Sequence, residues 1–331
     1  MPTGVSLRRR SGLASAGVST RSKGTHGLLF GVVAVIWGTP YALIKLALDG
    51  FSPEFVAWAR IAAAAVALAG VVGLREMAVV ARRSGRPVAV LAVLQFAVPL
   101  VLIAYAEQRV TSAMAGILIA SEPLWVAILA LRLDRSQRAS WRGLLGVLIG
   151  LLGVVLLLGV DAGGSAQLVS GVLVALAAGC YAAAALWLPR ATSATGPLPV
   201  IAVALSMSAV ALAPLGLTAL PAALPSATSV AALAALAGVC TAVAFPLWFA
   251  LIARAGAARA SLITYVSPIV AIVLGAVALG EHLRASAAGA VALIFAGSLL
   301  AARDHRPSAL RRPDVGERLL MAVQGPARER S

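Results

Sequence analysis

Residues 104–135 read AYAEQRVTSAMAGILIASEPLWVAILALRLDR, and residues 249–280 read FALIARAGAARASLITYVSPIVAIVLGAVALG. The two stretches align with one constant offset, which places Pro123 on Pro268 and Arg109 on Arg254. Both run from a short basic turn through small residues and a mid-span proline to an aliphatic exit. The chain therefore contains an internal repeat built from apolar helices.

The whole chain is as apolar as these two stretches, with 61% hydrophobic and only 12% charged residues. A soluble protein of 331 residues needs more polar surface than this. The apolar residues form blocks of about 20 residues, the length of a helix that crosses a bilayer. The ten predicted spans are residues 28–48, 54–73, 88–106, 112–131, 142–160, 170–189, 198–219, 230–252, 258–279 and 286–302.

The charges of the loops indicate that the two repeats have opposite orientations. Each repeat holds five spans, an odd number, so the second repeat enters the membrane from the other side. The segment between spans two and three carries Arg75, Arg82, Arg83 and Arg86, whereas its counterpart at 220–229 carries no charge. We therefore predict an all-α polytopic membrane protein with ten transmembrane helices in two inverted five-helix repeats.

The formal charge of +15 raises the question of nucleic-acid binding, but the distribution of the charge argues against it. All but four of the 27 Lys and Arg residues lie in the two tails or in alternate loops. This positive-inside pattern places both termini in the cytoplasm and predicts contact with membrane lipid, not nucleic acid. The predicted parts are a basic cytoplasmic tail (1–27), a first repeat (28–160), a second repeat (170–302) and a disordered cytoplasmic tail (303–331).

Several short motifs are similar to those of one known family. They are Trp37-Gly-Thr-Pro-Tyr-Ala-Leu-Ile-Lys45, Pro53-Glu-Phe-Val-Ala-Trp-Ala-Arg60, Ser112-Ala-Met-Ala-Gly-Ile-Leu-Ile-Ala-Ser-Glu-Pro-Leu-Trp125, Tyr265-Val-Ser-Pro-Ile-Val-Ala271 and Leu279-Gly-Glu281. On these residues the chain resembles the EamA branch of the drug/metabolite transporter superfamily over roughly residues 28–302. The resemblance implies a ten-helix carrier with a central solute pathway. It also implies transport of amino acids, other metabolites or toxic compounds, mostly outward. One departure is Leu133-Asp134-Arg135, which stands where a Gly-Glu pair usually follows span four.

The first hypothesis is a secondary transporter in the cytoplasmic membrane that exports a small-molecule solute by alternating access, with proton exchange. The only lysines are Lys23 and Lys45, so the chain has no phosphate-binding loop ending in Gly-Lys-Ser/Thr. No metal-ligand or cofactor motif is present either, and we predict no enzyme activity. The alternative is an intramembrane enzyme acting on a lipid-linked substrate, which needs a second acid, base or metal ligand near Glu122. A membrane scaffold or sensor would need a folded output domain, and the tails are too short and polar for one.

Glu122 is the residue most strongly predicted to take part in transport. It lies near the middle of span 112–131, where a carboxylate costs several kcal/mol unless it is paired, wetted or protonated. It is a candidate to bind a cationic group of the solute, to exchange a proton, or to do both in turn. Pro123 frees a backbone carbonyl one turn earlier. The structural alternative is a protonated Glu122 that bonds to a neighbouring helix.

The first span carries Trp37, Tyr41 and Lys45 at intervals of four residues, which places them in one stripe of the helix. This stripe is predicted to line the solute pathway. The alternative for Lys45 is that its long side chain reaches the membrane surface. Trp248 and Tyr265 are deep aromatics that could line a pocket. Ser267 stands where Glu122 stands in the first repeat, so we expect a single proton-active carboxylate per chain.

Arg60 lies inside span two, where an isolated charge requires a partner. We expect an ion pair with Glu54 on the same helix or with Glu107 across helices, acting structurally or as part of a gate. Glu107 itself and Arg109 are expected to be solvated at the outer mouth.

Span five carries a stripe of glycines at Gly143, Gly146, Gly150 and Gly153. Such stripes allow helices to approach closely. The stripe is interpreted either as a homodimer face or as packing between the two repeats. The two cysteines, Cys180 and Cys240, are expected to be small buried hydrophobic residues.

Overall fold

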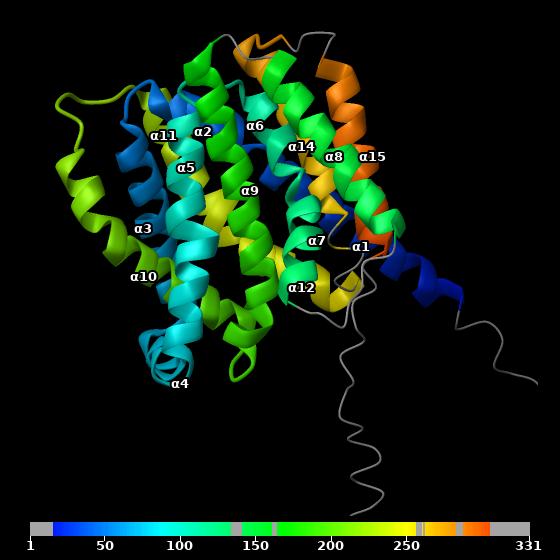
Figure 1. Ribbon diagram of the computed structural model, residues 1–331. Helices are drawn as coiled ribbons and strands as arrows, with labels where there is room; N and C mark the ends of the chain where they lie inside the picture. The colour runs from blue at the N-terminus through cyan, green and yellow to red at the C-terminus, as the bar shows by residue number, and fades with distance from the viewer. Residues whose placement is uncertain are drawn as a thin grey trace, which may run out of the picture.

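The computed structural model describes residues 16–133, 141–160, 164–255, 260, 262–282 and 287–304. Within these ranges the chain is helical and contains no strand (Figure 1). The predicted C-terminal tail lies outside the described residues from 305 onward. The helices are α1 Ala16–Gly38, α2 Pro40–Leu48, α3 Pro53–Val72, α4 Leu74–Ala92, η1 Val93–Ala97, α5 Val98–Ala106, α6 Ser112–Ile119, α7 Glu122–Leu133, α8 Trp141–Val160, α9 Ser165–Thr192, α10 Pro197–Thr218, α11 Ala227–Ala237, η2 Gly238–Val243, α12 Ala244–Ala255, α14 Ile263–Leu279 and α15 Ala287–Asp304.

These helices form the ten predicted spans, so the predicted fold class is confirmed. Eight helices of the described part are long and apolar enough to cross a membrane, and α14 and α15 are shorter apolar helices. Spans one, three, four and eight each consist of more than one helix in succession. We number the spans in chain order: α1–α2, α3, α4–η1–α5, α6–α7, α8, α9, α10, α11–η2–α12, α14 and α15.

The largest error in the predicted boundaries is at span three. Residues 74–87, predicted as a charged loop, are helical and form the first part of α4. This part is amphipathic, because Val80 is buried while Arg75 and Arg82 are exposed. The helix bends at Ser84, which has non-helical backbone angles, before the apolar part begins.

Two other boundaries differ from the prediction. Helix α1 begins at Ala16, inside the segment predicted as a tail, and α14 begins at Ile263 although span nine was predicted from residue 258. At α1 the difference arises because hydropathy marks only the part of a helix that fits hydrocarbon, whereas the helix extends beyond it cooperatively.

The packing of the spans repeats itself when each span is exchanged for its partner five places along the chain. Span one packs on spans eight and nine, and span six packs on spans three and four. Three further contacts each join a span to its own equivalent in the other repeat. They are the contacts between spans two and seven, spans four and nine, and spans five and ten. A pseudo-two-fold axis in the membrane plane produces this pattern, so the two repeats are inverted copies.

Both repeats also contain a π-helical turn at the same place. The turn η1 in span three begins at Val93, and η2 in span eight begins at Gly238, which is the same offset that relates Pro123 to Pro268. Wide turns of this kind occur mostly as single bulges inside α-helices, frequently at functional sites.

The two ends of the bundle can be told apart by the chain direction. Helix α1 begins and α15 ends at the lower end in Figure 1, which we call the terminal end. The loops 49–52, 107–111 and 280–282 lie at the opposite end, which we call the distal end. A buried core near the distal end combines residues of both repeats and includes Ile44, Ile103 and Ile117, with contributions from α8, α9, α11 and α15.

The glycine stripe of span five packs within the chain. A Cβ atom at Gly146 would lie 2.6 Å from the Ala301 nitrogen, and one at Gly153 would lie 2.8 Å from the Ala290 carbonyl oxygen. Helices α8 and α15 therefore approach each other at backbone distance, and they lie side by side in Figure 1. The stripe joins span five of the first repeat to span ten of the second. This agrees with the interpretation of the stripe as packing between the two repeats.

Candidate functional site

Span four is interrupted immediately before Glu122. Helix α6 ends at Ile119 and α7 begins at Glu122, so Ala120 and Ser121 separate the two half-helices. The hydroxyl of Ser298 on α15 donates to the freed Ala120 carbonyl at 3.3 Å. Pro123 has no N–H to continue the hydrogen-bond ladder, which explains why the interruption occurs here. Glu122 is thus at the N-terminus of a helix, where a carboxylate is favoured.

The Glu122 side chain lies deep within the bundle and yet is only half-buried from solvent. Glu122 is therefore inside the bundle without being sealed in its core. Its electrostatic neighbours are three tyrosines, Tyr41 on α2, Tyr181 on α9 and Tyr265 on α14. The Tyr265 hydroxyl is buried without a hydrogen-bond partner. The structure therefore surrounds Glu122 with phenol groups from both repeats.

The predicted stripe of span one is divided by a second helix interruption. Helix α1 ends at Gly38 and α2 begins at Pro40, so Trp37 belongs to α1 while Tyr41 and Lys45 belong to α2. The ring centroids of Trp37 and Trp248 on α12 are 4.9 Å apart. Two predicted site residues from different repeats thus meet at this point.

Ser267 lies on α14 where this helix crosses the break of span one. A Cβ atom at Gly38 would lie 2.5 Å from the Ser267 carbonyl oxygen, so only glycine allows this approach. Helix α14 is continuous through Pro268, whereas span four is interrupted beside the equivalent Pro123. The repeats therefore differ at this position in backbone as well as in side chain.

Arg60 is buried in α3, with 8% of its side chain exposed. Its Nε atom donates to the Thr241 hydroxyl at 2.9 Å, and that hydroxyl donates to the Leu236 carbonyl at 2.8 Å. The expected ion pair with Glu54 is absent from the described structure, since a spacing of six residues places the two side chains on different sides of α3, and the Glu54 carboxylate accepts a hydrogen bond from Tyr105. Arg60 also interacts electrostatically with Glu107, although these two described side chains form no ion pair.

Glu107 is not solvated at the mouth as predicted. It is completely buried, and neither carboxylate oxygen has a hydrogen-bond partner. Burial raises the pKa of this carboxyl well above its ordinary value, the nearby Lys45 partly lowers it, and Glu281 raises it further. Glu107 follows the last turn of α5, and sequence does not reveal to which side a residue at a helix end points.

A clamp at the distal end joins the two repeats. The Glu281 carboxylate, just after α14, accepts hydrogen bonds from the Ser112 amide at 2.9 Å, the Ser112 hydroxyl at 2.7 Å and the Ala113 amide at 3.2 Å. It thereby caps the N-terminus of α6. Gly280 makes the turn with a φ of 64°, a conformation that favours glycine. We call this set of contacts the distal clamp. The sequence shows the Leu279-Gly-Glu281 motif but does not indicate which residues the Glu281 carboxylate binds.

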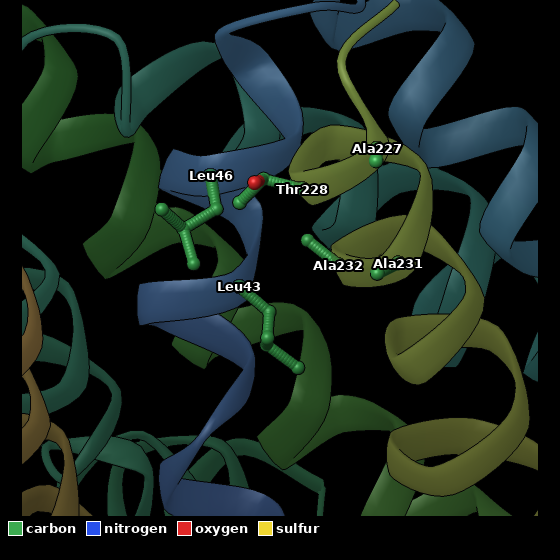
Figure 2. A pocket seen from close by; sticks show the side chains of 6 residues that line it. All are labelled: Leu43, Leu46, Ala227, Thr228, Ala231 and Ala232. Carbon is green, nitrogen blue, oxygen red and sulfur yellow. The ribbon is translucent and has the colours of Figure 1, made fainter.

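An apolar groove lies apart from this interior. It has a volume of about 500 Å³ and is formed between α2 and α11 (Figure 2). Leu43 and Leu46 are on the side of α2 opposite to Tyr41 and Lys45, as the helical period of 100° per residue requires. Thr228 is the only polar side chain of its lining, which suits hydrocarbon better than a polar solute.

Comparisons with known proteins agree with this architecture. A family model described as the EamA-like transporter family matches residues 25–159 and 169–303. The uncharacterized transporter YdfC of Bacillus subtilis (strain 168) is 30% identical over 154 residues, 46% of this chain and 48% of that protein. The match thus spans about half the length of that relative. A protein of known crystal structure has the same fold, with a TM-score of 0.57 at 20% identity over 84% of this chain and 96% of the other.

Proposed function

The chain belongs to the EamA-like transporter family, and on that premise we propose that it exports a small metabolite, amino acid or drug in exchange for protons. Its fold is that of a multi-pass membrane protein of the drug/metabolite transporter superfamily. The proposed mechanism is alternating access, in which the two inverted repeats rock about a site near the centre of the membrane.

The observation that carries this proposal is Glu122 at the interruption of span four. A carboxylate at this depth is costly unless it serves a function or finds a partner. Glu122 has partial access to solvent and three phenol groups around it, which suits both a proton and a cationic or hydroxylated solute. Pro123, Trp37, Tyr41, Lys45, Arg60, Trp248, Tyr265 and Ser267 complete the proposed pathway.

The distribution of burial supports a carrier that is closed at its distal end. Every residue of α6 from Ser112 to Leu118 is buried, and the distal clamp joins this helix to the second repeat. Interior residues nearer the terminal end, such as Glu122, Trp125 and Trp248, are only half-buried. Because the basic residues favour a cytoplasmic terminal end, the proposed state is open toward the cytoplasm.

The experiment compares small molecules inside and outside cells that produce the wild type, Glu122→Gln or Glu76→Gln. Glu76 is an exposed carboxylate on α4 and serves as the matched control. We expect a solute that is exported by the wild type and by Glu76→Gln but not by Glu122→Gln.

Equal export by Glu122→Gln would remove Glu122 from the mechanism and leave the carrier in place. If cells producing the wild type matched cells without the protein, the proposal of export would be wrong.

A further inference from the structure

Glu107 is a buried carboxyl group that the proposed pathway does not use. Its side chain is fully buried at the distal end, and both of its oxygens lack a hydrogen-bond partner. Burying a negative charge without donors is strongly unfavourable, whereas a neutral carboxylic acid is tolerated. The surroundings of Glu107 therefore select the protonated form while the distal end is closed.

The position of Glu107 connects its protonation to the distal clamp. Glu107 begins the loop that leads into α6, whose first amides are bound by Glu281. Glu107 and Glu281 are electrostatic neighbours, and Glu281 takes the three donors while Glu107 has none. The closed arrangement thus provides hydrogen bonds for one of its two carboxylates only.

We propose that Glu107 is a proton-binding site of the distal clamp. The carboxylate takes a proton from water on the distal side as the clamp closes, and it returns that proton to water when the clamp opens. This inference rests on the proposed exchange of solute for protons. It adds a second carboxyl group, at the distal end, whose protonation accompanies closing of that end.

The charged and titratable groups around Glu107 come from three elements. Lys45 and Tyr41 are on α2, Arg60 is on α3, and Glu281 follows α14. Tyr41 interacts electrostatically with Glu122 as well as with Glu107. Tyr41 is therefore near enough to both carboxyl groups to be affected by the charge of each.

The expected pH dependence follows from the direction of the pKa shift. Burial raises the pKa of Glu107 in the closed state, and opening returns it toward its ordinary value. The stabilisation of the closed state is therefore complete at pH values below the ordinary pKa. It is lost as the pH rises through the raised pKa, because Glu107 must then be buried as an anion.

The test is hydrogen–deuterium exchange of the Ser112 and Ala113 amides in the purified full-length protein in lipid nanodiscs. Rates are measured over a pH series and divided by the intrinsic chemical rate at each pH. We expect the wild type and Glu76→Gln to lose protection as the pH rises. Glu107→Gln should keep its protection throughout, and Glu281→Gln should be poorly protected at every pH.

A second variant keeps the test decisive if Glu107→Gln does not fold. Lys45→Gln removes the positive charge that favours ionised Glu107, so the pH at which protection is lost should rise by about one unit or more. Wild-type pH dependence in Glu107→Gln, or an unchanged or lower midpoint in Lys45→Gln, would overturn the proposal. The readout needs no solute, so this result is independent of the export experiment.

Discussion

The hydroxyl of Thr241 is a hydrogen-bond acceptor for the buried guanidinium of Arg60 on α3. It accepts from Arg60 Nε and belongs to the wide turn η2. Thr241→Val keeps the shape of the side chain but leaves a buried charged donor without this acceptor. We expect a loss of about 1–3 kcal/mol in the free energy of unfolding, measured by thermal or denaturant unfolding in detergent.

Thr241→Ser is the matched control, since it keeps the hydroxyl and loses only a methyl group. A Thr241→Val protein as stable as the wild type would show that the Arg60 hydrogen bond contributes nothing to stability.

For single residues, the sequence identifies ionisable side chains that are energetically unfavourable inside a membrane span more readily than it identifies the residues they contact. Glu122 and Arg60 were recognised because an ionisable group within an apolar span is expensive wherever it points. For Glu107 the sequence predicts a solvated position, and for Glu281 it gives no partner. Both depend on the rotation of a helix end and on contacts between residues far apart in the chain.

At the scale of single elements, apolar length predicted all ten spans because hydrocarbon sets a minimum helix length. Interruptions left a weaker signal: Pro40 and Pro123 mark the breaks of spans one and four, but Pro268 lies inside a continuous helix. The two wide turns η1 and η2 leave no composition signal. Only the backbone hydrogen bonding shows that they occur at equivalent positions in the two repeats.

The contact between α8 and α15 gives a prediction for an element pair. A Cβ atom at Gly153 would lie 2.8 Å from the Ile294 nitrogen, which belongs to the backbone of α15 and cannot move alone. Gly153→Ala should therefore lower the free energy of unfolding by about 1–3 kcal/mol through overpacking.

Gly289 on α15 has nothing within 4 Å of the equivalent Cβ position and serves as the control. Gly289→Ala should be neutral, or more stable by up to about 1 kcal/mol, because alanine favours helix. If Gly153→Ala and Gly289→Ala changed the free energy of unfolding equally, the expected overpacking between α8 and α15 would be absent.

At the scale of the whole molecule, the packing of the spans follows from the inversion of one five-span repeat relative to the other. Two units of five spans can pack as equivalent partners only if one is inverted, and the contacts of spans one and six and of the pairs two–seven, four–nine and five–ten then match. The distal clamp is made in the described structure by Glu281 of the second repeat. The equivalent positions of the other repeat pair, near residues 134–140 and 256–259, lie outside the described residues.

The orientation of the molecule follows from charge and is tested by cysteine labelling. Gln108 is exposed at the distal end, and Ser193 is exposed at the terminal end. In a background with Cys180→Ser and Cys240→Ser, we expect a membrane-impermeant thiol reagent to label Gln108→Cys in intact cells. Ser193→Cys should react only after permeabilisation, because the basic terminal end faces the cytoplasm. The reverse pattern would place both termini outside, and labelling of both sites in intact cells would indicate that both orientations are inserted. Either result would also change the side of the membrane from which Glu107 takes its proton.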